Sequence, residues 1–309
     1  GEPGQPADPA EGLVWTEIVE NVERSDVDGT YVSVTDLPRE ALATHPWSLT
    51  GGGAEGLLAA IDRGRTTLAE LNVDIGMTAL TGEDDAFLLP ANAIPKQLRQ
   101  WATPICVGDE VRDYALVPAA VALLPVTTQG ERREPDAGLM KHFWPVMTGL
   151  KNRLYFGQTP QQRGIRWFDC AMFFSKRHAA PMSIAFAFVA THNHFVLDRG
   201  GKVFNRSAPV IKLPAEATED DHLALLGILN SSTACFWLKQ NSHGKGNGGV
   251  NEGFRGDDWE EFFEFTGTTL KDYPLPPTVP LTRGRLMDSL AQDLAAVSPG
   301  AVAEAGVPT

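Results

Sequence analysis

The sequence predicts a mixed α+β protein, in which an N-terminal α/β part precedes a β-rich part supported by helices. Short apolar runs alternate with helical patterns over residues 12–128, as expected of an α/β segment. A polar stretch with Pro135 at residues 129–138 then indicates a boundary. Strand-like segments dominate the region that follows, which we assign to residues 139–280.

The N-terminal part begins after residues 1–11, which are rich in Pro, Gly and acidic residues and are typical of a solvated linker. Its clearest helical pattern covers residues 54–71, and its apolar runs have the length of short strands. These strand-like runs are residues 31–34, 73–80, 105–107 and 121–126.

The second part is predicted to open with a helix over residues 141–150. Strands should follow at residues 166–174, 182–190 and 194–197. Gly200 and Gly201 then supply the positive φ angles of a turn, which predicts a hairpin with residues 202–205 and a basic loop tip.

Helix-start signals are clear further along the chain. Thr218 and Asp221 have capping-box spacing before an apolar helix, and a second helix should run to about Gln240 after an interruption at residues 230–232. A glycine-rich loop at residues 244–256 follows, of the kind that often binds a ligand. Residues 281–309 are expected to form a C-terminal helix and a truncated tail.

The charge of the chain is unevenly distributed. The net charge is −13, which argues against a nucleic-acid partner because affinity for DNA depends largely on Lys and Arg at phosphates. However, residues 139–213 hold 11 basic and 2 acidic residues, whereas residues 1–138 carry −14 and residues 214–309 carry −8. This segregation predicts one cationic surface on an acidic protein.

Several common catalytic signatures are missing from the sequence. Gly51, Gly53 and Gly56 match a dinucleotide-binding spacing, but a proline-bearing turn stands where the buried strand should be, so we interpret them as the start of a helix. The phosphate-binding loop of NTPases and the nucleophile elbow of hydrolases do not occur. The three cysteines are widely spaced and indicate reduced, partly buried thiols, with the cytoplasm as the expected compartment.

His192 and His194 leave one enzymatic alternative open. Two histidines at i and i+2 on a strand share a face and could ligate a metal in a hydrolase, with Asp198 or Cys170 as a third ligand. Hydrogen-bonding histidines at the start of a strand are the simpler interpretation, so we predict no metal site and no catalytic residue in this chain.

Arg, Lys and Asn are the residue types that contact DNA phosphates and base edges, and they gather in the basic segment and in the two glycine-bearing loops. A solvated basic face is the competing interpretation. The predicted DNA-binding residues are Arg163, Arg166, Lys176, Arg177, His192, Asn193, His194, Arg199, Lys202, Asn205, Arg206, Lys245, Asn247, Asn251 and Arg255.

Residues 191–213 (THNHFVLDRGGKVFNRSAPVIKL) and residues 225–239 (LLGILNSSTACFWLK) resemble the C-terminal part of the PglX family. These are adenine-specific DNA methyltransferases of phage growth limitation and BREX type 2 defence systems. Residues 261–276 and 108–113 resemble segments in the same order in that family. A helix reading LLGILNSS followed by LKDYPLP is also similar to the specificity regions of TaqI-like and type IIG enzymes.

The resemblance implies that the parent protein is an N6-adenine methyltransferase that uses S-adenosylmethionine. Neither the glycine-rich cofactor loop nor the NPPY-type tetrapeptide of that family occurs here, so we expect an excised target-recognition region without a cofactor of its own. Its expected partners are double-stranded DNA and the methyltransferase domain of the same parent. The rival hypothesis is an interaction scaffold that binds other BREX/Pgl proteins or a phage inhibitor.

Overall fold

The structure, a computed structural model, describes residues 8–36, 39, 43, 54–63, 66–112, 114–245 and 261–304. It divides into two compact units, Gly1–Arg65 and Thr66–Thr309, which we describe separately. In the described residues no helix is long and apolar enough to cross a membrane.

The first unit contains a helix tied to a hairpin. Strands β1 and β2 are antiparallel, and the Glu17 carboxylate of helix α1 accepts hydrogen bonds from the backbone N–H groups of Thr30 and Tyr31 in their turn. A Cβ on Gly29 would lie 2.8 Å from the Val32 carbonyl oxygen, a backbone atom that cannot move aside, so this turn favours glycine. The elements are η1 (Pro9–Glu11), α1 (Leu13–Asn21), β1 (Asp26–Asp28), β2 (Ser33–Thr35) and α2 (Ala54–Asp62).

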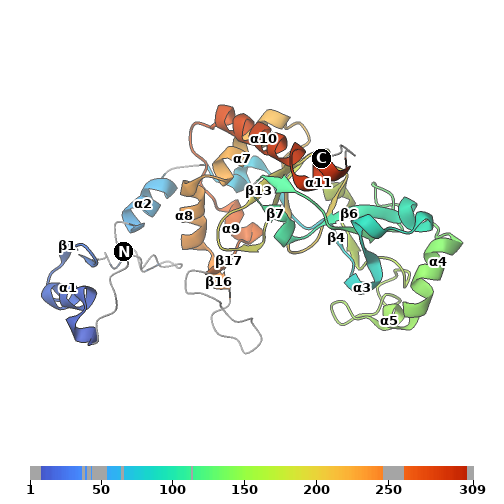
Figure 1. Ribbon diagram of the computed structural model, residues 1–309, viewed down its shortest axis with the longest axis horizontal. Coiled ribbons are helices and arrows are strands. Elements are labelled where there is room, and N and C mark those ends of the chain that lie inside the picture. Colours follow the sequence, from blue (N-terminus) through green and yellow to red (C-terminus); the bar gives the residue numbers. More distant parts are fainter. Residues whose placement is uncertain are drawn as a thin grey trace. The chain divides into compact units, whose positions relative to one another are not determined.

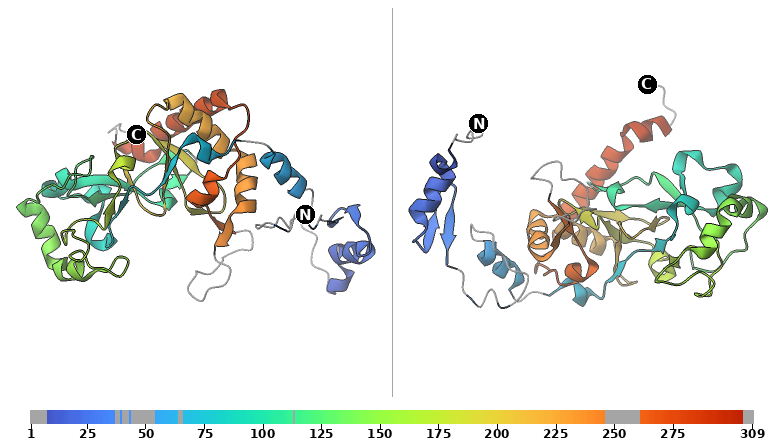
Figure 2. Two further views of the ribbon diagram at one scale, coloured as in Figure 1. Left: turned by 180° about the vertical axis from the view of Figure 1, so that it is seen from behind. Right: turned by 90° about the horizontal axis from the view of Figure 1, so that it is seen from below.

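One end of the second unit is built on a mixed sheet of order β14-β6-β9-β5 (Figures 1 and 2). Phe87, Trp101, Leu123 and Phe143 are buried in the core that joins this sheet to its helices. The elements are α3 (Asp84–Phe87), β5 (Leu88–Pro90), η4 (Ala91–Ala93), η5 (Lys96–Trp101), β6 (Ala102–Cys106), β9 (Ala120–Leu123), α4 (Ala137–Phe143), η7 (Trp144–Val146), α5 (Met147–Asn152) and β14 (Val203–Phe204).

The other end carries an antiparallel sheet of order β13-β11-β15-β3, packed against α7 (Figures 1 and 2). Every residue of β11, β13 and β15 is buried, which explains their almost continuous apolar character. The elements are β3 (Asp74–Gly76), β11 (Ser183–Phe186), β13 (Phe195–Asp198), β15 (Val210–Lys212), α7 (Glu219–Leu229), α8 (Ser232–Asn241) and α10 (Leu281–Ala296).

Smaller sheets complete this unit, in the orders β10-β4, β12-β17-β16 and β7-β8. The remaining strands are β4 (Ala79–Leu80), β7 (Val111–Arg112), β8 (Ala115–Leu116), β10 (Met172–Phe173), β12 (Val189–Ala190), β16 (His243–Lys245) and β17 (Phe262–Glu264). The remaining helices are η3 (Leu68–Leu71), η6 (Gly108–Glu110), α6 (Ser175–His178), α9 (Gly267–Lys271) and α11 (Pro299–Glu304).

The α+β class and the local helix signals are confirmed. Thr218 and Asp221 form the predicted capping box of α7, and Ser231 caps α8 after the break at Asn230. The predicted helix over residues 141–150 is interrupted, because Pro145 lies in the short 3-10 helix η7 between α4 and α5.

Three expectations differ from the structure. Gly200 and Gly201 do have positive φ angles, yet β13 and β14 on either side of them join different sheets and form no hairpin. The strand predicted over residues 166–174 is reduced to β10, because Arg166 and Asp169 close a turn. Residues 129–138 do not separate compact units, since β3 pairs with β15 and β4 pairs with β10 across them.

Candidate nucleic-acid interface

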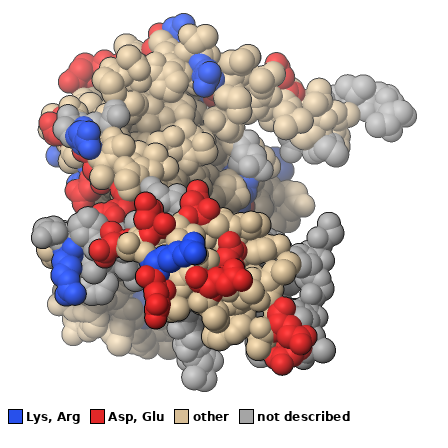
Figure 3. Space-filling model, turned by 90° about the vertical axis from the view of Figure 1, so that its left-hand side faces the viewer, with Lys and Arg blue, Asp and Glu red and all other residues tan. Residues whose placement is uncertain are grey.

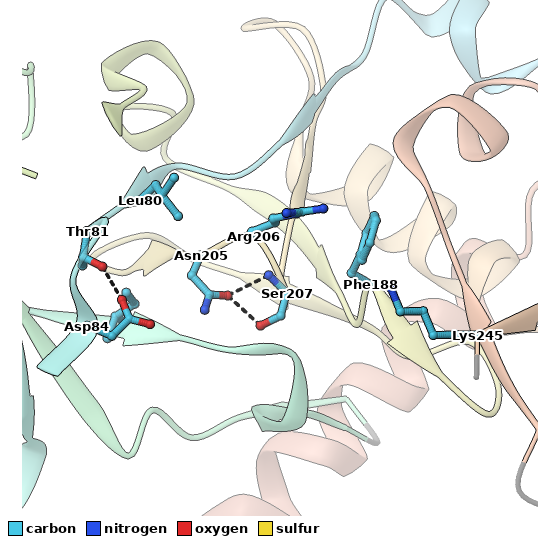
Figure 4. A pocket seen from close by; sticks show the side chains of 9 residues that line it. Leu80, Thr81, Asp84, Phe188, Asn205, Arg206, Ser207 and Lys245 are labelled. Carbon is cyan, nitrogen blue, oxygen red and sulfur yellow. Dashed lines mark hydrogen bonds between the residues drawn. The ribbon is translucent and has the colours of Figure 1, made fainter. Parts of the chain in front are cut away.

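A pocket of about 380 Å³ lies between the two ends of the second unit (Figure 4). It brings together three of the residues predicted from sequence to contact DNA, Asn205, Arg206 and Lys245. The remaining lining residues come from β4, the start of α3, β6 and the segment after β11. They are Leu80, Thr81, Asp84, Ile105, Phe188 and Ser207.

A local turn after β14 fixes Asn205 and Ser207. Asn205 Oδ1 accepts hydrogen bonds from the Ser207 backbone N–H (2.9 Å), the Ser207 hydroxyl (2.8 Å) and the Ala208 backbone N–H (3.2 Å). Ser207 Oγ accepts in turn from the backbone N–H of Gly108 at 2.8 Å. The Asn205 amide nitrogen is therefore the group that remains to donate to a ligand, and the residue suits an acceptor such as a phosphate or guanine N7.

Gly108 permits this turn to lie against the loop after β6. A Cβ at this position would come within 2.5 Å of the Ser207 carbonyl oxygen, a contact that no side chain tolerates. Gly108 thus allows the loop after β6 to pack directly against the turn that carries Asn205 and Ser207.

Arg206 and Lys245 supply the positive charge of the pocket. Both are exposed, and Figure 4 shows Phe188 between them. Within the described part of the chain, no carboxylate lies within ion-pair distance of Arg206, and Lys245 Nζ lies 4.0 Å from Glu264. Two cations beside a half-buried aromatic ring can bind a phosphate and stack on a base or sugar.

Four other predicted DNA-contacting cations are held in ion pairs instead. Arg166 binds the buried Asp169 at 2.8 Å, and Arg177 binds Asp74 through two nitrogens at 2.8 and 2.9 Å. Arg199 and Lys202, in the turn after β13, are also held in ion pairs. Arg199 binds Glu219 (2.6 Å) and Asp288 (2.7 Å), and Lys202 binds Asp198 (2.9 Å).

These ion pairs give the four side chains contacts within the fold, and their predicted contact with DNA stays a prediction. The hydrogen bond to Asp288, with a smaller contribution from Glu219, raises the pKa of Arg199 above its usual range. The sequence could not distinguish Arg177 and Arg199 from free cations, because their partners Asp74, Glu219 and Asp288 lie far away along the chain. The partners of Arg166 and Lys202 lie only three and four residues away.

Seven cations of the basic segment form no ion pair among the residues that the structure describes. Two of them, Arg153 and Lys212, donate to backbone carbonyl oxygens instead, which leaves five. Arg163 lies over the Tyr155 ring at 5.1 Å, and the other four are exposed at the surface. The five are Lys141, Lys151, Arg163, Lys176 and Arg206.

The predicted residues near the histidines serve different roles. Asn193 is buried and donates its side-chain amide to the carbonyl oxygens of Leu229 and Ser231, which anchors β13 to the α7–α8 junction. The rings of exposed His192 and buried His194 lie 4.2 Å apart. In the described ranges, no group of three or more His, Cys, Asp or Glu side chains is placed to hold a metal ion.

The other predicted residues and thiols are placed as follows. Asn247, Asn251 and Arg255 lie outside the described residues. All three cysteines are free; burial raises the pKa of Cys106 and of Cys170 to about 12, so these two thiols are protonated near neutral pH.

Sequence reasoning missed Thr81, Asp84, Phe188 and Ser207. Thr81 donates a hydrogen bond to Asp84, and both reach the pocket from the link between β4 and α3 (Figure 4). Isolated polar residues at strand ends carry no motif, and only the pairing of β4 with β10 and of β6 with β14 brings them to Asn205. The NRS tripeptide at residues 205–207, with its Asx-turn character, was the available signal.

The chain is similar in sequence to a known adenine-specific methyltransferase. The chain aligns over its whole length with the adenine-specific methyltransferase PglX of Streptomyces coelicolor, at 42% identity over 322 residues. The chain is homologous to part of PglX. It spans 26% of the length of PglX, and the resemblance inferred from residues 191–213 and 225–239 is thereby confirmed.

Two further comparisons accompany the match to PglX. The type IIG restriction endonuclease BpuSI gives a TM-score of 0.44 at 9% identity, covering 78% of this chain and 28% of that structure. No family model matches the chain.

Proposed function

We propose that this chain binds duplex DNA and selects the site at which a parent adenine-specific methyltransferase acts. In this proposal the chain contributes recognition, while S-adenosylmethionine binding and methyl transfer belong to the methyltransferase domain of the same parent. The homology to PglX supports a role connected with DNA methylation.

The observation that carries the proposal is the contrast between cations held in short ion pairs and the two cations that face the pocket. Arg166, Arg177, Arg199 and Lys202 are neutralised within the fold, whereas Arg206 and Lys245 face a pocket with hydrogen-bonding groups beside them. Arg206 forms no ion pair in the described part of the chain and Lys245 has only a long one, 4.0 Å to Glu264, so both cations are suited to phosphates. The cluster around Asn205 is suited to base edges.

The proposal is tested by fluorescence anisotropy of duplex oligonucleotides at several salt concentrations. The double variant Arg206→Ala/Lys245→Ala should weaken binding about tenfold or more at low salt. It should also reduce the slope of log affinity against log salt by about 2, because two phosphate contacts are lost. Arg283→Ala/Lys271→Ala, with the same change of charge at exposed residues outside the pocket, should leave binding nearly unchanged.

Equal effects of the two double variants would contradict the assignment of the pocket. An unaltered chain that fails to bind any duplex at low salt would contradict the proposed function as a whole.

One observation favours the rival interaction-scaffold function, with other defence proteins or a phage inhibitor as partners. Leu286, Leu290 and Leu294 of α10 are each more than half exposed and follow one another at intervals of four residues, which forms an apolar helix stripe. Replacing Leu290 and Leu294 with Gln should leave DNA binding intact under the DNA-recognition proposal. Loss of a protein partner in co-purification with intact DNA binding would assign the stripe to that second role.

A further inference from the structure

The loop after α5 exposes a large aromatic side chain, Phe156, to solvent. Phe156 is 82% exposed and its neighbour Leu154 is 67% exposed. Single exposed apolar side chains are common on protein surfaces, and the conformation of this turn is what distinguishes Phe156 from the others.

The turn itself is tightly defined. Tyr155 and Gln158 bond to each other in both directions, at 2.9 and 3.2 Å between backbone N and O atoms. The two residues between them, Phe156 and Gly157, have φ angles of +50° and +72°. Both central residues of a type I′ turn have positive φ, a conformation that suits Asn and Gly and disfavours Phe. A phenyl ring at this position is therefore retained against the local backbone preference.

The Phe156 ring packs edge-on against the neighbouring Tyr155 ring, which in turn contacts Arg163. The Tyr155 ring centroid lies 4.5 Å from that of Phe156, at an angle of 62°. The guanidinium carbon of Arg163 lies 5.1 Å from the Tyr155 centroid on the same loop. This arrangement limits the motion of the Phe156 side chain and places a cation close to it.

The positive charge of the residues around Phe156 indicates the kind of partner that this turn would bind. Residues 137–168, which we call the acid-free segment, contain five basic residues and no Asp or Glu, in a chain whose net charge is −13. Lys141 and Lys151 are exposed, and Arg163 lies beside the tip. Arg166 of this segment is paired with Asp169 and Arg153 donates to backbone carbonyl oxygens, so Lys141, Lys151 and Arg163 are its cations without an ion pair in the described part of the chain. An exposed apolar ring beside such cations is complementary to a polyanion with an apolar interior, which is the chemistry of stacked base pairs between phosphate strands.

We propose that Phe156 is a wedge that inserts between neighbouring base pairs of duplex DNA, with Lys151 and Arg163 at the flanking phosphates. This inference rests on the proposed DNA-binding function and adds a specific distortion to it. Insertion separates two base pairs, unwinds the duplex locally and bends it. Such a distortion lowers the cost of displacing a base for a parent enzyme that acts on adenine.

The test measures unwinding independently of the recognised sequence. Closed circular plasmid is relaxed by a topoisomerase with the full chain at saturating concentration, and the change in linking number is read from the topoisomer distribution. Duplex binding of each variant is measured in parallel by anisotropy. The unaltered chain should shift the distribution, whereas Phe156→Asn should bind three- to tenfold more weakly and produce no shift at saturation.

Phe156→Asn is chosen because Asn tolerates positive φ, so the turn is preserved when the ring is removed. Phe156→Trp keeps an aromatic ring and should retain the shift. Trp144→Ala removes a second exposed aromatic, 62% exposed in η7, and should leave the shift unchanged.

A linking-number change of Phe156→Asn equal to that of the unaltered chain would overturn the wedge and leave the tip as a site for a protein partner. Duplex binding without any linking-number change in the unaltered chain would also overturn the wedge, while the proposed function would stand. Failure of the unaltered chain to bind duplex would overturn both.

Discussion

Arg166 connects three segments through its guanidinium group. It binds both oxygens of the Asp169 carboxylate and donates to the carbonyl oxygens of Arg133 and Pro125. The Asp169 side chain is only 7% exposed, and its other cation, Arg132, is 3.7 Å away and half exposed. A carboxylate buried to this degree depends on its partner for its charge to be tolerated.

Arg166→Ala should therefore lower the free energy of unfolding by about 3 kcal/mol, since it leaves a buried charge poorly compensated. Arg163→Ala, which removes a cation without an acidic partner a few residues away, should change it by less than about 0.5 kcal/mol. Urea denaturation followed by circular dichroism measures both values. Similar losses for the two variants would show that the Arg166–Asp169 pair has no special structural role.

Lys212 is a buried cation in the middle of a sheet. Its ammonium donates to the carbonyl oxygens of Ala180 and Met182, at 3.4 and 3.3 Å. Burial lowers its pKa from 10.5 to about 8, with Asp198 and Asp74 acting in the opposite direction. The unfolded chain thus binds more protons than the folded chain between pH 8 and 10.5, and this residue makes folding more favourable as the pH rises through that window.

Lys212→Met should remove that dependence. Below pH 8 the variant escapes a penalty of roughly 3 kcal/mol for the buried charge, and above pH 10.5 the penalty is absent from both proteins. The difference in unfolding free energy between variant and unaltered chain should therefore decrease in magnitude or change sign across this window. Denaturant melts at pH 7.5, 9 and 10.5 measure it, and a difference that stays constant with pH would contradict the depressed pKa.

At the scale of elements, α10 and α7 pack unusually closely. A Cβ on Gly284 would lie 2.2 Å from the Leu223 carbonyl oxygen, and Gly227 faces the Gly284 backbone from α7. Arg285 pairs with Asp220 and Asp288 with Arg199, so polar contacts flank the glycine contact. The close approach is what brings Asp288 to the turn after β13.

Gly284→Ala should force the two helices apart and destabilise the fold by about 2 kcal/mol or more, because the clash is with backbone atoms. Gly149→Ala is the matched control, since Gly149 lies in α5 with no atom within 4 Å of the added Cβ. It should stabilise the fold by about 0.5–1 kcal/mol through the loss of chain entropy in the unfolded state. Thermal denaturation distinguishes the two, and equal melting temperatures would refute the close contact.

At the scale of the whole molecule, charge is divided between the parts. Residues 1–65 hold 4 basic and 12 acidic residues, whereas the acid-free segment is purely basic. Figure 3 shows a face on which Asp and Glu outnumber Lys and Arg. Under the proposed DNA-binding function, a strongly acidic part should oppose association with DNA over distances of about a Debye length.

Neutralising exposed acidic residues of the first unit should therefore strengthen DNA binding at low salt. The variant Glu20→Gln/Glu23→Gln/Asp26→Asn/Asp28→Asn changes the net charge from −13 to −9. We expect a two- to threefold lower dissociation constant at about 0.05 M salt and no difference at 0.5 M, because salt screens the repulsion. Anisotropy titrations provide the measurement, and a gain that persists at 0.5 M would indicate a direct contact instead.

The sequence by itself determined the features that depend on neighbouring residues. The capping box at Thr218, the break at Asn230 and the positive φ angles of Gly200 and Gly201 follow from hydrogen bonds and sterics within a few residues. Charge segregation and the resemblance to PglX were also readable, since they depend only on composition and residue order.

Only the tertiary structure decided which cations are available for DNA. Arg177 meets Asp74 across 103 positions and Arg199 meets Asp288 across 89, so their neutralisation depends on sheet and helix packing. The same packing gathers Thr81, Asn205 and Lys245 around one pocket and leaves Phe156 at a projecting tip. The Arg166–Asp169 and Lys202–Asp198 pairs are local in sequence, whereas contacts between segments this far apart are set by the fold as a whole, because no local pattern encodes them.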